Sequence, residues 1–157
     1  MRYKNVRNLI IEGPDGVGKT TLIKGLFKHY NYKYMCYHRG ELSNRLFAEK
    51  FKRPFYETQR GIPFIYIVLA ANDEDLKNRI IRRAEDEHWQ DADLQKELKT
   101  VEYSHEYLLL ANEMLEDYDI YVVNTSGKTE DQVLESVISI LDSREKWDRK
   151  EALCDFT

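Results

Sequence analysis

The sequence predicts an α/β protein in which a parallel β-sheet is covered by helices on both faces. The first observation is that short apolar runs alternate with longer segments whose apolar residues recur at helical spacing. The second is that residues 8–11 and 64–71 are almost continuously apolar, as strands buried on both faces are. The third is that the 157 residues contain no Pro-, Gly- or Ser-rich linker, which favours a single domain over 1–157.

Each element can be placed from the sequence. Strands are expected at residues 8–11, 32–37, 64–71 and 118–124. Helical apolar spacing covers Leu22 to Tyr30, Leu42 to Phe51, Leu76 to Ala84, Leu94 to Leu115, and Val133 to Leu141. Asn72 before the acidic residues 73–75 is typical of an N-cap, and Thr129 with Gln132 forms a capping-box pattern. The charged residues 142–157 are expected to extend or fray from the last helix.

Composition excludes several classes of protein. The chain is 42% hydrophobic and 33% charged, which is enough apolar material for one core and too much for a disordered chain. No run approaches the ~20 apolar residues of a membrane span, so no membrane partner is expected. No apolar run precedes a small-residue cleavage site, so no secretory signal is expected. Cys36 and Cys154 are the only cysteines and do not form a C-x-x-C motif, which favours a reduced, cytoplasmic protein.

Charge is distributed unevenly along the chain. The formal net charge is -4, but residues 1–60 contain 13 Lys and Arg against 5 Asp and Glu. Residues 61–157 contain 11 Lys and Arg against 23 Asp and Glu. Such a split in one domain predicts a basic face and a ligand that carries phosphates. A chance split over two solvated surfaces is the alternative.

Residues 13–20 form a glycine-rich loop, Gly-Pro-Asp-Gly-Val-Gly-Lys-Thr, that fits G-x-x-x-x-G-K-[ST] between an expected strand and an expected helix. Its glycines let successive backbone N–H groups turn inward toward phosphate oxygens, and the helix adds its positive N-terminal end. Lys19 can reach the β- and γ-phosphates of ATP, and Thr20 can ligate Mg²⁺. The expected residues for Mg²⁺ with ATP are Gly13, Asp15, Gly16, Val17, Gly18, Lys19, Thr20 and Thr21.

Residues 11–21 closely resemble the opening of thymidylate kinases and related deoxynucleoside and deoxynucleoside monophosphate kinases. Later segments are similar to the family in order and spacing, at residues 64–69, 73–83, 107–111 and 121–133. The resemblance covers roughly residues 8–36 and 63–141. It implies a nucleotide-kinase-like P-loop NTPase fold and transfer of the γ-phosphoryl group of Mg·ATP to a deoxynucleoside monophosphate.

The same resemblance implies roles for particular residues. Asp15 would approach the sugar of the acceptor and the metal region; a simple turn-forming aspartate is the alternative. Arg79, Arg82 and Arg83 would belong to a lid over the phosphates, where neutralising charge on the moving phosphoryl group promotes transfer. A solvated helix with surface ion pairs is the alternative for these arginines.

The acceptor side departs from the family pattern. Many relatives have Asp-Arg after a strand, whereas this chain has His38 before Arg39. Arg39 is expected to clamp a phosphate, with a plain surface arginine as the alternative. An ordinary strand-end histidine is favoured over a base for His38. The segment between Tyr30 and Pro63 is shorter than in the family, which implies a shortened acceptor-binding region.

Three phenylalanines in that region are four residues apart and would share a helix face if the helix ran that far. They are Phe47, Phe51 and Phe55. Packing in the core is favoured for them over stacking on a base. The basic residues around them suit a phosphorylated acceptor, whether a mononucleotide or a DNA end.

Other functions stay open at this stage. A deoxynucleoside kinase and a polynucleotide kinase are alternatives within phosphoryl transfer, so a nucleic-acid partner is a less favoured possibility. A nucleotide-binding module without turnover is the alternative from another class. No carboxylate ends the strand at Ala71, which disfavours motor and switch ATPases. The four histidines suggest no catalytic or metal site, and Trp89 has no evident role. A homodimer is possible because relatives often pair through helices.

Overall fold

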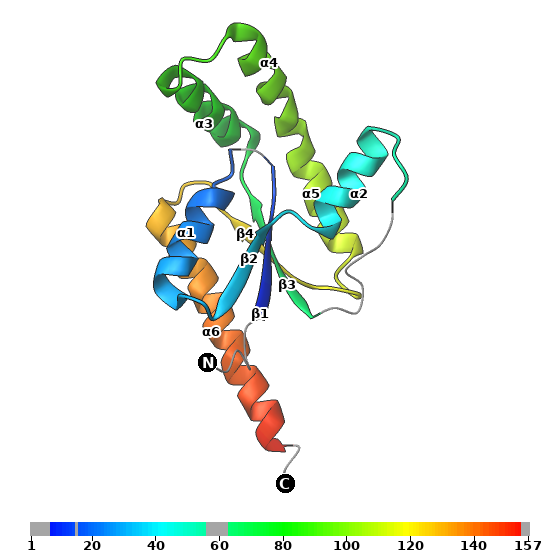
Figure 1. Cartoon of the computed structure of the whole chain (residues 1–157), viewed down its shortest axis with the longest axis vertical. Helices are drawn as coiled ribbons and strands as arrows, with labels where there is room; N and C mark the ends of the chain where they lie inside the picture. Colours follow the sequence, from blue (N-terminus) through cyan, green and yellow to red (C-terminus); the bar gives the residue numbers. More distant parts are fainter. Residues whose placement is uncertain (1–6, 15, 56–62, 155–157) are drawn as a thin grey trace.

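The computed structural model describes residues 7–14, 16–55 and 63–154, with side chains of the last helix described as far as Lys146. These residues form a four-stranded sheet in which every neighbouring pair is parallel. Its order is β2-β1-β3-β4 (Figure 1). The strands are β1 (Arg7–Glu12), β2 (Tyr34–His38), β3 (Phe64–Ala70) and β4 (Asp119–Asn124). The chain moves from β1 to β2 on one side and then crosses to β3 on the other, so the order reverses between β1 and β3.

Helices lie on both faces of this sheet (Figure 1). They are α1 (Lys19–Tyr30), α2 (Glu41–Lys50), α3 (Asp73–Asp86), α4 (Asp91–Lys99), α5 (Tyr103–Glu113) and α6 (Glu130–Cys154). The predicted parallel α/β class is confirmed. The apolar pattern from 94 to 115 is not one regular helix, because a 3₁₀ turn at Thr100–Glu102 separates α4 from α5. The Thr100 hydroxyl donates to the Glu97 carbonyl at 2.6 Å, which suits the tighter turn.

Alternating side chains of the strands fill two separate cores. On one face, Leu9 and Ile67 pack in the cluster that α1, α3 and α6 cover. On the other face, Ile10 and Tyr66 pack in the cluster that α2 and α5 cover. All four residues are 0% exposed. Because successive residues of a strand point to opposite faces, the continuous apolar runs bury the sheet on both sides.

Both predicted helix caps are confirmed. The Asn72 side chain accepts a hydrogen bond from the Asp75 amide at 2.8 Å. The Thr129 amide donates to the Gln132 side chain at 2.9 Å, and the Gln132 amide donates back to the Thr129 hydroxyl at 3.2 Å. These contacts satisfy N–H groups that a helix start leaves without partners. They fix the starts of α3 and α6, the two helices that flank the turn after β4.

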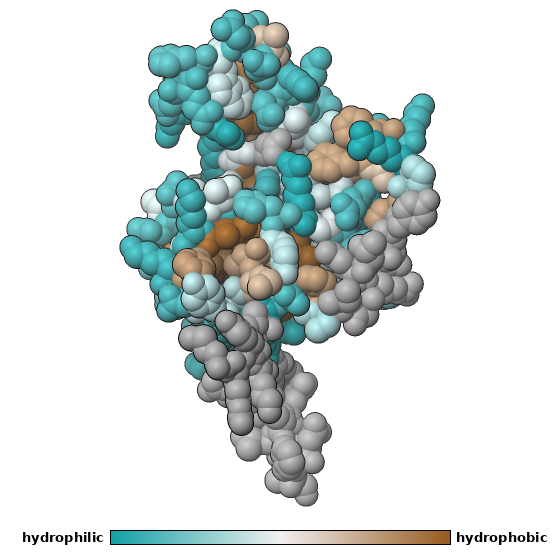
Figure 2. All heavy atoms as spheres, viewed as in Figure 1, coloured by the Kyte–Doolittle hydropathy of each residue, from teal (hydrophilic) through white to brown (hydrophobic). Residues whose placement is uncertain are grey.

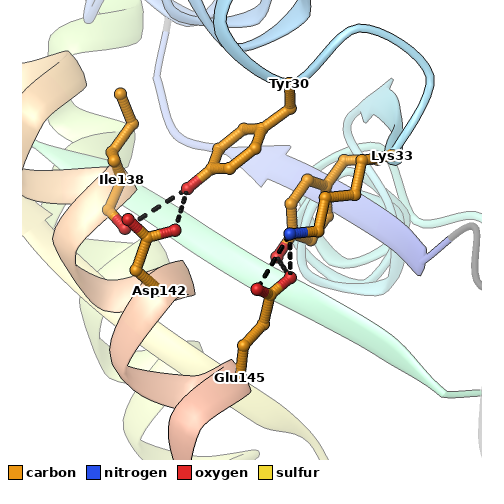
Figure 3. A network of polar contacts seen from close by, with 6 residues as sticks. Tyr30, Lys33, Ile138, Asp142 and Glu145 are labelled. Carbon is orange, nitrogen blue, oxygen red and sulfur yellow. Dashed lines mark hydrogen bonds and ion pairs between the residues drawn. The ribbon is translucent and has the colours of Figure 1, made fainter.

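The helix α6 continues through most of the segment that was expected to extend or fray. A polar network holds its middle against the end of α1 and the start of β2 (Figure 3). The Tyr30 hydroxyl donates to Asp142 at 2.7 Å. The Glu145 carboxylate accepts from Lys33 at 2.8 Å and from the Tyr34 hydroxyl at 3.0 Å. The helix therefore keeps tertiary contacts beyond the apolar positions that end at Leu141.

No helix within the described residues combines the length and apolarity needed to cross a membrane. Some large apolar side chains on and after α5 are nevertheless open to solvent, among them Leu109 at 64% and Leu115 at 52%. The homodimer stays a prediction.

Replacing Tyr30 by Phe removes one hydroxyl from the network and keeps the ring. We expect the free energy of unfolding to fall by about 1 kcal/mol, because the hydrogen bond to Asp142 is lost. Urea denaturation followed by circular dichroism measures the change. Tyr32→Phe is the control, since the Tyr32 ring is 72% exposed. Equal stabilities of the two variants would contradict the anchoring role of the network.

Candidate functional site

A cavity of about 850 Å³ lies at the carboxyl ends of the strands, where ligands bind in open α/β sheets. Its lining comprises residues 16–22, His38, Arg39, Arg79, Arg82, Arg83, Glu87, Thr125, Lys128, Glu130 and Val133. In Figure 2 the molecule is hollowed at left between the arm formed by α3 and α4 and the body below it. The structure thus brings residues 16–20 of the glycine-rich loop and the predicted arginines to one cavity. Among the described residues, six cationic side chains and two carboxylates line it.

The glycine-rich loop is held tightly against the sheet. Gly13 has a φ of +143°, and a Cβ there would lie 2.5 Å from the carbonyl oxygen of Leu69 in β3. Gly18 is the N-cap of α1 with a φ of 99° and makes no side-chain cap. Both positions require glycine, because other residues rarely adopt such φ values. Because Gly18 has no side chain, it cannot cap the first amides of α1, and a helix N-terminus of this kind is suited to an anion.

Lys19 is folded back onto the loop. Its ammonium group donates to the carbonyl oxygens of Gly13 and Pro14, each at 2.8 Å. Thr20 and Thr21 are exposed on the cavity side of the same helix start. The roles of these residues toward ATP and Mg²⁺ stay predictions. Asp15, the remaining predicted loop residue, lies outside the described residues.

The described residues offer few ligands to a divalent cation here. No group of three or more His, Cys, Asp or Glu residues suited to a metal occurs in the described part of the chain. Mg²⁺ commonly keeps several waters and takes one or two protein ligands together with substrate phosphates. The exposed Thr20 hydroxyl in the cavity fits that limited protein contribution.

Glu12, the last residue of β1, is a buried carboxylate that sequence reasoning did not single out. It is 0% exposed and accepts hydrogen bonds from the Gly40 amide and the Ser43 hydroxyl. The Ser43 hydroxyl is in turn 2.8 Å from the Tyr107 hydroxyl of α5. Burial raises the pKa of Glu12, and the hydrogen bonds and Lys19 oppose this without cancelling it. The sequence did contain one signal that could have identified Glu12: an ionisable residue that ends an apolar strand directly before the glycine-rich loop.

Arg39 follows β2 and lies at the cavity. It has a φ of 60°, an uncommon value for a residue other than glycine, and its amide donates to the Ile11 carbonyl at 2.9 Å. Its guanidinium lies 5.2 Å from the centre of the Phe47 ring. His38, which ends β2, is exposed and also lines the cavity. The positions agree with contact to a ligand, and the roles stay predictions.

The three predicted lid arginines all line the cavity, but they differ in their contacts. Arg79 donates to the hydroxyl of Thr125 at 3.0 Å and to its carbonyl at 3.1 Å, so it is tied to the turn after β4. Arg83 pairs with Glu87 at 3.2 Å. Arg82 is exposed. The i,i+4 pair Arg79 and Arg83 does share the face of α3 that was expected.

The phenylalanines after Arg39 do not form the expected core face. The helix α2 ends at Lys50, so Phe55 lies beyond it. Phe47 and Phe51 stack with ring centres 6.1 Å apart, yet Phe51 is 56% exposed. The guanidinium of Arg53 lies 5.2 Å from the Phe51 ring centre. Core packing was therefore the wrong interpretation for Phe51, because it borders the exposed end of a short helix.

Arg39, Phe47, Phe51 and Arg53 together form what we call the cation–aromatic row. One end of the row, Arg39, lines the cavity, and the other end lies beyond the last turn of α2.

Comparison with known proteins adds no further constraint: no protein-family model matches the chain, and no curated protein matches it either.

Replacing Glu12 by Gln tests the buried carboxylate. The amide can still accept from Gly40 and can donate to Ser43, so the fold should survive. Because the folded-state pKa of Glu12 is raised, the native protein holds this proton to higher pH than the unfolded chain. The stabilisation is complete below the unfolded pKa, near 4.5, and is lost as pH rises through the folded pKa.

We therefore expect the stability of the unsubstituted protein, relative to Glu12→Gln, to fall as pH rises above about 4.5, by at most ~1.4 kcal/mol per pH unit. Urea denaturation of both proteins between about pH 4 and about pH 8 measures the difference. A difference that does not change with pH would contradict the raised pKa.

Proposed function

We propose that this protein is a P-loop kinase that transfers the γ-phosphoryl group of Mg·ATP to a deoxynucleoside monophosphate, as the thymidylate kinase-like sequence pattern implies. The observation that carries the proposal is the cavity itself. The N-terminal end of α1 and the glycine-rich loop form one wall, and Arg39 and the arginines of α3 lie on others. Phosphoryl transfer depends mainly on positioning and on neutralising the phosphate charge, and the amides and cations gathered here support the proposal on both counts.

Under this proposal, the loop amides and Lys19 hold the phosphates of ATP, and the Thr20 hydroxyl contributes a ligand to Mg²⁺. Lys19 exchanges the two loop carbonyls that it now contacts for phosphate oxygens. Arg79 is fixed by Thr125 at the β4 end of the cavity, on the donor side. Arg39 and Asp15 orient the acceptor, and Arg82 and Arg83 neutralise charge on the transferred group.

A polynucleotide acceptor is the second candidate, and the cation–aromatic row favours it. Exposed rings offer stacking surfaces to bases of any sequence, and Lys or Arg beside them can contact phosphates. The row continues from the cavity at Arg39 to the exposed Phe51 and Arg53. A single mononucleotide bound in the cavity would leave the outer part of the row unused.

Phosphate transfer to a panel of acceptors tests the proposal. The purified protein is incubated with Mg·ATP and each of the common deoxynucleoside monophosphates, thymidine, or a 5′-hydroxyl oligonucleotide. We expect transfer to one monophosphate and a loss of about 100-fold or more in Lys19→Ala, on the scale of removing one donor to the reacting phosphates. Lys24→Ala is the matched control, because Lys24 is exposed on the same helix.

The result assigns the acceptor class. Transfer to the oligonucleotide alone, with an activity that falls steeply as salt rises, would establish the second candidate, since contacts to several phosphates release counterions. Transfer to thymidine alone would indicate a deoxynucleoside kinase. Binding of Mg·ATP without any transfer would contradict the kinase proposal and favour a binding module.

A further inference from the structure

The chain reverses its direction at the end of α3. The C-cap residue is Glu87, and His88 follows it with a φ of 55°. The Trp89 amide donates to the Ala84 carbonyl at 2.9 Å, and the His88 amide donates to the Glu85 carbonyl at 3.4 Å. This is the Schellman arrangement, in which one left-handed residue reverses the chain after a helix. It returns the indole of Trp89 to the last turn of α3, beside Arg83.

Three side chains of this turn contact one another. The Nε of Arg83 lies 3.2 Å from a carboxylate oxygen of Glu87. The indole N–H of Trp89 donates to the other oxygen of the same carboxylate at 2.8 Å. The guanidinium carbon of Arg83 lies 5.3 Å from the centre of the Trp89 ring. We call Arg83, Glu87 and Trp89 the arginine latch. Each member contacts both of the others, so the guanidinium has a defined place.

The latch borders the cavity, since both Arg83 and Glu87 belong to its lining. Glu87 is unusual there, because the described residues of the lining include six cationic side chains and, besides Glu87, the carboxylate of Glu130 alone. The hydrogen bond from Trp89, followed by that from Arg83, lowers the pKa of Glu87, so its carboxylate is charged at neutral pH. A negative charge at the edge of a phosphate site weakens phosphate binding. We therefore expect Glu87 to have a role there that offsets this cost.

The exposure of the pair indicates what that task is. The side chains of Arg83 and Glu87 are 59% and 51% exposed. An exposed ion pair of this kind contributes little stability, so it is easily exchanged. A phosphate group offers a guanidinium the same planar pair of acceptor oxygens as a carboxylate does, with more negative charge. Glu87 therefore resembles a stand-in for a phosphate.

We propose that Glu87 and Trp89 are positioning residues that hold Arg83 at the cavity edge until a nucleotide binds, when its guanidinium moves from Glu87 to a phosphate oxygen. The inference rests on the proposed function, because the incoming ligand is the polyphosphate of Mg·ATP. Until then, Glu87 keeps Arg83 away from the other cations of the cavity, and Trp89 limits its rotation. Binding of the nucleotide separates Arg83 from the Trp89 ring.

Trp89 makes the movement visible. The chain has two tryptophans, so Trp147→Phe leaves Trp89 as the only one. In this variant, titration with Mg·ATP should change the emission of Trp89, because a cation beside the ring and a hydrogen bond on its N–H are both altered. Calorimetry of the same titration measures binding independently. We expect both curves to saturate at the same nucleotide concentration, and Arg83→Gln to remove the emission change at saturating Mg·ATP.

Glu87→Gln tests the competition. We expect Mg·ATP to bind about threefold to tenfold more tightly to this variant, since the exposed ion pair no longer retains Arg83. Glu85→Gln is the matched control, because Glu85 is exposed on the same last turn of α3 and the substitution removes the same charge. Its affinity should stay within about twofold of the unsubstituted protein, on the scale of a small surface effect.

The outcomes separate the latch from the proposed function. Calorimetric binding of Mg·ATP with no change in Trp89 emission, or with unaltered or weaker binding to Glu87→Gln, overturns the latch and leaves the function standing. Equal gains in affinity for Glu87→Gln and Glu85→Gln also overturn it, because they would show a general charge effect. Absence of calorimetric binding overturns the proposed function, and the latch with it.

Discussion

The arrangement of the cavity depends on one buried carboxylate. Glu12 ends β1 directly before the glycine-rich loop, and its oxygens accept from Gly40 and Ser43 at the start of α2. A charged or partly charged group without exposure is tolerated only where such hydrogen bonds replace water. The same contacts fix the backbone beside Arg39, and Ser43 continues the network to Tyr107 of α5. The side chain of Glu12 thus connects the backbone before the glycine-rich loop to the backbone that follows Arg39, and so fixes the relative positions of two walls of the cavity.

Local signals in the sequence were sufficient for most of the fold. The four apolar runs, the N-cap at Asn72 and the capping box at Thr129 are all formed by neighbouring residues, and the structure contains each of them. The strand order was not available in the same way, because it depends on which distant strands meet. The ends of helices were also less certain. The 3₁₀ turn at Thr100–Glu102 keeps the apolar spacing of the surrounding helices, so periodicity does not reveal it.

Residues of the candidate site that lie next to one another in a sequence motif were predictable. Residues that the fold brings together from distant parts of the chain were less so. The glycine-rich loop is contiguous, whereas the basic lining of the cavity comes from both halves of the chain, including Lys19 and Arg39 in one and Arg79 and Lys128 in the other. Counting charges by halves predicts only that a basic face exists. The resemblance to nucleotide kinases adds Arg39 and the three arginines of α3, whereas nothing in the sequence pattern indicates Lys128. Glu12 was missed because its importance comes from partners about thirty residues away, and no spacing rule marks such contacts.

The charges of the site fall into two physical classes. Glu12 is buried, and its carboxylate oxygens accept hydrogen bonds from Gly40 and Ser43. Removing these donors would leave a buried polar group unpaired at a large cost in free energy, so the position of Glu12 is fixed. The cations of the cavity are different. Lys19 contacts two loop carbonyls, Arg79 contacts the turn after β4, and Arg83 contacts an exposed carboxylate. Each of these partners can be exchanged for a phosphate oxygen without leaving a buried charge unpaired. The buried Glu12 keeps the backbone of such a site ordered before a ligand binds. The cations above it can still exchange their partners for ligand oxygens, so the site combines a fixed geometry with the ability to bind.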